Sequence, residues 1–290
     1  MKKGAGVGRA ILIAVHPTRV DAAEMARALA DSLIAEGFAL YSNNPFLVPG
    51  SEMYGNTSAV ELVVVLGGDG TILRGAEMAR GTDAPIIGIN MGNVGFLAEV
   101  IRPTVETIVQ AISEKNYSIE SRLLLAYTVE RAGKVVESGW AMNEITLEKS
   151  HAQMVELFVQ VDGRPLSRWG CDGVIVATPT GSTAYAFSAG GPVLWPEVEA
   201  LVLLPLAAHA LFSRPMVIAP TSSVVVDIES ESAELAADSM RRFSLQANDR
   251  ISISRDPIRV SLAHIDGAGF TDRLVAKFKL PIEGWRGERK

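Results

Sequence analysis

The sequence contains a single cysteine, few aromatic residues and no apolar run long enough to cross a membrane. With only Cys171, an intrachain disulfide is excluded, and the four histidines lack the spacing of metal ligands. The longest apolar stretch, residues 200–208, contains a proline and ends before His209. We therefore expect a reducing, cytoplasmic location, no membrane association and no metal bound by protein ligands alone.

An excess of basic residues is also lacking. Lys and Arg number 27 against 33 Asp and Glu, which gives a net charge of -6. A surface that neutralises a phosphate polymer is normally basic, so we do not expect nucleic acid as a partner. A small anionic ligand remains compatible with this charge, because the amino end of a helix binds anions locally. The 290 residues fit one large domain or two medium ones.

Residues 1–100 alternate between apolar runs and helical patterns. The runs 10–15, 62–66 and 86–89 predict strands, and residues 20–36 and 71–80 predict helices. Because the runs are continuously apolar, we expect parallel strands that are covered on both faces. This pattern predicts an α/β domain.

After about residue 120 the pattern changes to short alternating segments, which predicts a mainly β domain built as a sandwich or as stacked sheets. The expected strands are 124–130, 145–147, 155–161, 174–177, 224–228, 251–254 and 260–263. Asp162 and Gly163 form a typical hairpin turn pair. We place the domain boundary near residue 100, where Arg102-Pro103 accompanies the change in periodicity.

The loop of Gly67, Gly68, Asp69 and Gly70 lies between an expected buried strand and an expected helix. Its glycines let the backbone approach a ligand closely, and the helix behind it favours an anion, so the loop can hold phosphate. The loop lacks the lysine of a P-loop and the spacing of a dinucleotide fingerprint. Asp69 would repel phosphate, so it either caps the helix or acts on a metal-bound water or an attacking hydroxyl.

Residues 178–185 follow another expected strand and contain several hydroxyls. Thr180, Ser182 and Thr183 place these hydroxyls around one small volume, whereas a turn with a helix cap at Ser182 or Thr183 needs only one. Ser188 lies in a sequence that resembles the nucleophile elbow of serine hydrolases, but Gly190 and the residues after it would end the required helix at once. A hydrolase is therefore disfavoured.

Two further features have simple interpretations from the residues alone. Asn143 and Glu144 open a β segment, where polar side chains usually mark an exposed strand end. His209 lies in an apolar stretch, where a lone histidine is more often packed and hydrogen-bonded than catalytic.

Taken together, these motifs resemble those of the NAD kinase family, in order along nearly the whole chain. The matching segments are 67–70, 92–97, 143–144, 178–185 and 188–192, followed by His209 and residues 273–278. The glycine-aspartate loop is shared with lipid kinases and phosphofructokinases, whereas the 178–185 string is far more specific. The tail is most similar to actinobacterial members.

The resemblance implies Mg²⁺-dependent transfer of a phosphoryl group from ATP to the 2′-hydroxyl of the adenosine ribose of NAD. Asp69 would orient that hydroxyl and accept its proton, and Gly67, Gly68 and Gly70 would shape the loop beside the phosphates. The residues implied to hold nucleotide are Arg74, Asn143, Glu144, Asp172, Thr183, Ala184, Tyr185, Ala186, Phe187, Ser188 and His209. Mg²⁺ would be carried on the donor nucleotide.

The family fold implies a Rossmann-like domain at 1–100, a β-rich NAD-binding domain at 101–267, and a tail at 268–290 that returns to the first domain. It also implies a homodimer or homotetramer whose neighbouring subunits complete the site. Polyphosphate as donor, NADH as acceptor and feedback by NADPH stay open. The chain departs from the family pattern at Ser239, Met240 and Gly170. Some family members have a basic residue at the position of Gly170, and Arg168 lies close enough in sequence to substitute for it.

Two other functions remain in view. One is a related kinase that acts on another hydroxyl, and the other is a dinucleotide-binding regulator without turnover. The acidic composition disfavours a lipid kinase, which needs a membrane-facing surface. A pure sensor has no need for a carboxylate beside the transferred group.

Overall fold

The computed structural model describes residues 8–55, 59–92, 94–99, 102–265 and 267–282. Contacts divide the chain into two units, one of Met1–Ser121 with Val260–Lys290 and one of Arg122–Arg259. The first boundary lies later than the expected residue 100, because helix α3 (Val105–Glu114) packs into the core of the first unit. The chain rejoins this unit at Val260, before the expected residue 268, because the end of strand β17 (Arg250–His264) pairs with its sheet. Of the expected tail, residues 283–290 lie outside the described residues.

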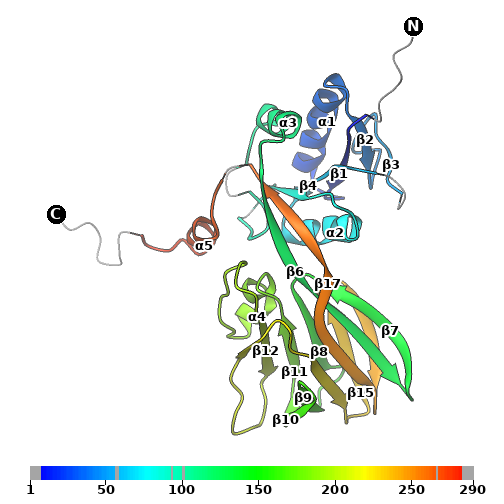
Figure 1. Cartoon of the computed structure of the whole chain (residues 1–290), viewed down its shortest axis with the longest axis vertical. Coiled ribbons are helices and arrows are strands. Elements are labelled where there is room, and N and C mark those ends of the chain that lie inside the picture. The colour runs from blue at the N-terminus through cyan, green and yellow to red at the C-terminus, as the bar shows by residue number, and fades with distance from the viewer. Residues whose placement is uncertain (1–7, 56–58, 93, 100–101, 266, 283–290) are drawn as a thin grey trace, which may run out of the picture. The chain divides into compact units, whose positions relative to one another are not determined.

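The first unit contains a parallel sheet in the order β3-β2-β1-β4-β5, with the end of β17 beside β5. The strands are β1 (Ala10–Val15), β2 (Ala39–Ser42), β3 (Glu52–Met53), β4 (Leu62–Gly67) and β5 (Ile86–Asn90). Helix α1 (Val20–Ala35) and α3 cover one face, and α2 (Asp69–Ala79) packs on the other face through Gly75, where an added Cβ would meet Val65 (Figure 1). The expected parallel sheet with two covered faces is therefore confirmed.

Helix α1 ends where the sequence predicts. Gly37 adopts φ +88°, and the Phe38 N–H donates to the Leu33 carbonyl at 3.0 Å, which is the hydrogen bonding of a glycine-terminated helix. Val20, the first residue of the helix, is 73% exposed. The apolar face of the helix starts at Ala22.

The second unit is a β-sandwich. One sheet has the order β13-β12-β11-β8-β15-β16, and the other contains β10-β9-β14-β17 with β6 and β7 attached at β17. Apolar side chains of both sheets share one core. The strands are β6 (Ser118–Arg131), β7 (Lys134–Ala141), β8 (Glu144–Lys149), β9 (Val155–Val161), β10 (Arg164–Cys171), β11 (Gly173–Ala177), β12 (Leu201–Leu206), β13 (Met216–Ile218), β14 (Val224–Ile228), β15 (Ser232–Ala237) and β16 (Arg241–Gln246).

Two sequence predictions in this unit have different outcomes. Asp162 and Gly163 have φ values of 52° and 72°, so the predicted hairpin turn between β9 and β10 is confirmed. The separate strands expected at 251–254 and 260–263 are instead the single strand β17. Polar residues interrupt the alternation between them, but the backbone stays extended through this part of the chain.

Helix α5 (Phe270–Phe278) follows β17 and belongs to the first unit. Together with the α/β sheet and the sandwich, this return of the chain confirms the fold that the sequence predicted. No helix in the described part of the chain is long and apolar enough to span a membrane.

Candidate active site

The glycine-aspartate loop connects β4 to α2 in the first unit. A Cβ on Gly67 would overlap the Thr71 side chain, so this position requires glycine. By contrast, nothing lies within 4 Å of a Cβ placed on Gly68 or Gly70, which leaves open space beside the loop. Arg74 is exposed on α2, one turn further along. The loop therefore combines a tight strand end with an accessible helix start.

Asp69 does not cap its helix. Gly68 occupies the N-cap position and no side chain caps the helix, so the capping interpretation is wrong. The Asp69 carboxylate instead accepts hydrogen bonds from two backbone amides, Phe96 N–H at 3.0 Å and Leu97 N–H at 3.2 Å. A Cβ on Gly95 would overlap this carboxylate. The segment around Phe96 therefore fixes the orientation of Asp69, a contact that links two of the motifs found in the sequence.

In the second unit, Asn143 and the turn after β11 lie against each other. Strands β8 and β11 pair with Glu144 opposite Ala177, and the Thr178 N–H donates to the Asn143 carbonyl at 2.9 Å. A Cβ on Gly181 would overlap the Asn143 backbone, so glycine is required where the two segments meet. The structure thus places residues 143–144 beside the segment 178–188.

The hydroxyls of this turn do not point freely into one volume, as the sequence suggested. Ser182 Oγ donates to the Pro179 carbonyl at 2.6 Å and accepts the Leu194 N–H at 2.9 Å. Thr183 Oγ1 donates to the Thr180 carbonyl at 3.1 Å. Neither acts as a helix cap, because both short helices here lack a side-chain cap. The hydroxyls brace the turn that carries the residues after it.

Those residues form the short 3₁₀ turn Gly181–Thr183 and helix α4 (Tyr185–Ser188). Ala186 is buried, Thr183, Ala184 and Tyr185 are partly buried, and Phe187 and Ser188 are exposed. Ser188 is the last residue of α4 and follows helix rather than strand, so the nucleophile-elbow interpretation is wrong.

Glu144 is a buried acid with unused hydrogen-bonding capacity. Its side chain is only 3% exposed, and its Oε2 has no hydrogen-bond partner among the residues that the structure describes. Burial raises the pKa of Glu144 to about 8, the negative charges of Asp238 and Glu148 add to this rise, and a hydrogen bond from the Tyr185 amide opposes it. Glu144 is therefore mostly protonated at neutral pH, and a bound ligand can still satisfy its free oxygen.

Asp238 also supports this region, although no sequence motif pointed to it. Its buried carboxylate accepts the N–H of Met142 at 2.9 Å, the N–H of Asn143 at 2.7 Å, and Arg241 Nη2 at 2.8 Å. Asp238 itself adopts φ 52° and Ser239 φ 57° in the turn between β15 and β16. The only sequence signal here was that Ser239, the residue after Asp238, departs from the family pattern.

Asp172 and His209 lie apart from Asn143 and Glu144. They sit near the start of β11, whereas Thr178 follows its end, about 17 Å further along a strand of this length. Asp172 Oδ1 is 2.5 Å from Lys149 Nζ, and the His209 N–H donates to the Gly170 carbonyl at 2.9 Å. Arg168, the expected substitute for a basic residue at Gly170, pairs with Glu229 at 3.0 Å. Within the second unit the predicted residues therefore form two separate groups.

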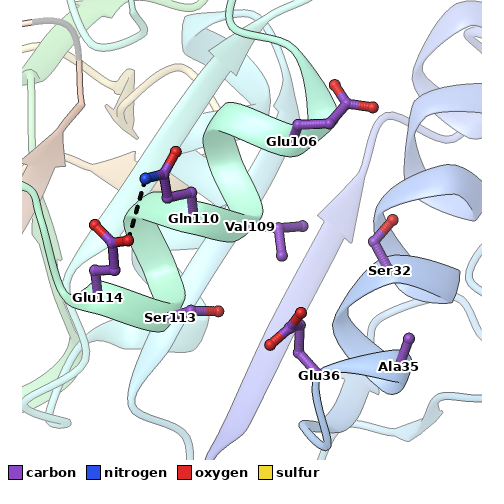
Figure 2. A pocket seen from close by; sticks show the side chains of 8 residues that line it. All are labelled: Ser32, Ala35, Glu36, Glu106, Val109, Gln110, Ser113 and Glu114. Carbon is purple, nitrogen blue, oxygen red and sulfur yellow. Dashed lines mark hydrogen bonds between the residues drawn. The ribbon is translucent and has the colours of Figure 1, made fainter.

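A hollow of about 550 Å³ lies elsewhere, between α1 and α3. Figure 2 shows its lining, to which Glu36, Glu106 and Glu114 contribute carboxylates. None of the predicted site residues lines it, and its acidic rim does not suit a phosphate ligand. In the described ranges, no group of three or more His, Cys, Asp or Glu residues is arranged to hold a metal ion.

Comparison with known proteins gives the same family as the motifs. The ATP-NAD kinase N-terminal domain model matches residues 51–117, and the ATP-NAD kinase C-terminal domain model matches residues 142–265. The NAD kinase of Thermobifida fusca is 43% identical over 307 residues, covering 98% of this chain and 93% of the relative. The NAD kinase of Leifsonia xyli subsp. xyli is 53% identical over 232 residues, covering 79% and 76%.

Solved structures show the same fold. A yeast NADH kinase complexed with NADH superposes with a TM-score of 0.86 at 21% identity, covering 97% of this chain and 90% of that chain. An NAD kinase from Archaeoglobus fulgidus in complex with ATP gives a TM-score of 0.70 at 25% identity, covering 94% and 100%. With both domain models matched and relatives similar along nearly its full length, this chain belongs to the NAD kinase family of phosphotransferases, which use NAD and ATP.

Proposed function

We propose that the protein transfers the γ-phosphoryl group of ATP to the 2′-hydroxyl of the adenosine ribose of NAD, giving NADP and ADP. The observation that carries this proposal is the anchoring of Asp69, a carboxylate beside an anion-binding loop, by the amides of Phe96 and Leu97. Such a carboxylate has no use in binding phosphate, which it repels. It is useful when an alcohol must be oriented and must lose a proton.

Asp69 acts by orientation first and as a base second. Each carboxylate oxygen accepts one amide hydrogen bond and keeps lone-pair capacity for the substrate hydroxyl. A carboxylate is too weak a base to form an alkoxide in advance, so the proton moves to Asp69 late, as the oxygen–phosphorus bond forms. The bond between the γ-phosphorus and the bridging oxygen breaks, and ADP leaves. The open space at Gly68 and Gly70 accommodates the phosphates.

The second unit supplies the dinucleotide site. Asn143, Glu144 and the segment from Thr183 to Ser188 hold NAD, and the free Oε2 of Glu144 pairs with a polar group of the nucleotide. As a mostly protonated acid, Glu144 donates a hydrogen bond at neutral pH and accepts one above its pKa of about 8. Arg74 binds nucleotide phosphate from the first unit.

Mg²⁺ is assigned to the donor nucleotide rather than to the chain. The described residues offer no three-ligand cluster of their own, and the roles proposed above belong to protein side chains alone. When present, the ion neutralises phosphate charge on ATP.

The functional assembly is a homodimer or homotetramer with shared sites. Asp172 and His209 lie together at the start of β11, apart from Asn143 and Glu144. We assign this second group to the dinucleotide site of a neighbouring subunit, which explains how both groups serve one ligand.

A product assay tests the function directly. Purified protein is incubated with NAD or NADH and with ATP or polyphosphate, in the presence of Mg²⁺, and NADP or NADPH is quantified. We expect NADP from NAD and ATP. Turnover on a different alcohol alone would favour the related-kinase alternative. Binding of NAD without any product would favour the regulator.

A further inference from the structure

The segment that holds Asp69 is itself held by the C-terminal part of the chain. Residues 94–99 follow β5 and contain no strand of their own. The segment lies against β5, where the Glu99 N–H donates to the Gly88 carbonyl at 2.8 Å. The backbones approach closely there, since a Cβ added to Gly88 would lie only 3.1 Å from the Leu97 carbonyl oxygen. These contacts fix the segment on β5, but they leave the Phe96 side chain to other partners.

Those partners are the two ends of helix α5. The Phe96 ring lies 5.8 Å from Phe270, the first residue of α5, and 5.9 Å from Phe278, its last residue, measured between ring centroids. Phe96 and Phe270 are 6% and 7% exposed, whereas Phe278 is 37% exposed. Contacts at these distances are typical of stabilising aromatic pairs. One side chain therefore lies between both ends of the helix.

Helix α5 is anchored independently of this aromatic group. Arg273, buried in the middle of the helix, places Nη2 2.9 Å from His264 Nδ1 at the end of β17. Glu99 Oε1 accepts the Ile265 N–H at 2.8 Å, which ties the 94–99 segment to the same strand end. Asp272 Oδ2 accepts the Gly269 N–H at 2.8 Å at the start of the helix. The helix is thus a fixed support rather than a loose tail.

We propose that Phe270 and Phe278 are positioning residues for catalysis: through Phe96 they fix the two backbone amides that orient the Asp69 carboxylate. This inference rests on the proposed function of Asp69. Helix α5 thereby takes part in the phosphoryl transfer. Its sequence does not indicate this role, and it lies far from Asp69 along the chain. Misplacement of a reacting group by about 1 Å costs about 100-fold in rate, so small shifts of these amides matter.

The first variant is Phe278→Ala, because this ring is partly exposed and its removal leaves the buried Phe270 in place. We expect kcat to fall about tenfold or more while the KM values for NAD and ATP change by less than about twofold. Phe278→Leu restores apolar contact and should recover most of the rate. Lys277→Ala, at the exposed neighbouring position of the helix, is the matched control and should behave as the unmodified protein.

Amide hydrogen exchange provides a readout that does not depend on turnover. In Phe278→Ala, the Phe96 and Leu97 amides should exchange faster, while amides in β1 keep their protection. In an Asp69→Asn background these amides have lost their charged acceptor. Adding Phe278→Ala there should accelerate exchange by much less than the same substitution does in the protein that keeps Asp69. The unfolding temperature of each variant, measured by circular dichroism, identifies global destabilisation.

The possible results are distinct. Unchanged kcat and unchanged amide exchange in Phe278→Ala overturn the proposal. An equal acceleration of exchange by Phe278→Ala in the unmodified protein and in the Asp69→Asn background also overturns it. A loss of kcat that Phe278→Leu does not recover, with exchange unchanged, also overturns it. If the unmodified protein makes no NADP, the proposed function fails, whereas faster exchange at Phe96 and Leu97 still supports the contact with α5.

Discussion

At the scale of single residues, two carboxyl groups have opposite environments. Asp69 is partly exposed and accepts two amide hydrogen bonds. Glu144 is buried, and one of its oxygens has no hydrogen-bond partner among the residues that the structure describes. The first environment orients a charged carboxylate, and the second favours the protonated acid. The two environments therefore suit the different tasks proposed for these residues, proton acceptance by Asp69 and ligand recognition by Glu144.

Asp69→Asn removes the proposed proton acceptor and keeps the size of the side chain. We expect kcat for NADP formation to fall by about 10²–10⁴-fold with little change in the dissociation constant for NAD, measured by calorimetry. Glu77→Gln, exposed on the same helix, is the control and should keep normal turnover. Normal turnover in Asp69→Asn would show that the assigned role is wrong.

Glu144 predicts a pH dependence of stability. Its pKa is about 8 in the folded protein against the usual 4.5, so between these values the folded state holds a proton that the unfolded state has lost. The free energy of unfolding should therefore fall as pH rises through this window. Glu144→Gln should flatten that decline. At pH 9 its free energy of unfolding, measured with urea, should be higher than that of the unmodified protein by on the order of 1 kcal/mol. Parallel curves for both proteins would contradict the assignment.

At the scale of elements, a hairpin turn supports the proposed dinucleotide site. The turn after β15 presents the Asp238 carboxylate to the amides of Met142 and Asn143, just before β8 begins. This geometry requires two consecutive residues with positive φ, Asp238 and Ser239. An aspartate tolerates that conformation, but a serine adopts it at a cost.

Ser239→Gly should relieve this cost and stabilise the protein. We expect a gain of about 1 kcal/mol in the free energy of unfolding, because glycine adopts φ near +57° without a Cβ clash. Ser244→Gly, in the middle of strand β16, is the matched control and should destabilise by roughly 0.5–1 kcal/mol. Thermal unfolding of both variants measures the difference, and equal shifts would exclude a conformational cause.

Asp238→Asn tests the link from this turn to the ligand. The substitution removes the charge that pairs with Arg241 and weakens the hold on the Asn143 amide. We expect the KM for NAD to rise more than the KM for ATP, since Asn143 and Glu144 belong to the proposed dinucleotide site. Equal increases for both substrates, with a lower unfolding temperature, would indicate general destabilisation instead.

At the scale of the whole molecule, the proposed assembly predicts complementation between subunits. A mixture of Asp69→Asn and Asp172→Ala subunits, exchanged under mild dissociation, should form mixed dimers in which one site has both residues intact. Random pairing would restore about a quarter of the unmodified activity. Asp69→Asn mixed with Glu144→Ala is the control without recovery, because both changes fall in the group assigned to one subunit. Absence of recovery in the first mixture would argue against shared sites.

The sequence by itself determined the features that depend on local pattern. Continuous apolar runs specified the buried parallel strands β1, β4 and β5, and Asp162-Gly163 specified a hairpin, because burial and turn geometry are expressed in neighbouring residues. The ordered motifs indicated the family, and Asp69 as its central residue. The cytoplasmic location stays a prediction.

Only the tertiary structure decided which groups meet. Asp69 finds its amides 27 and 28 residues away, and Asp238 supports Asn143 across 95 residues. The tertiary structure also showed that Asp172 and His209 lie apart from Asn143 and that two expected strands form the single strand β17. It further placed α5 in contact with Phe96. Such contacts join segments that fold together only when the chain closes its core, so no periodicity or spacing along the sequence records them.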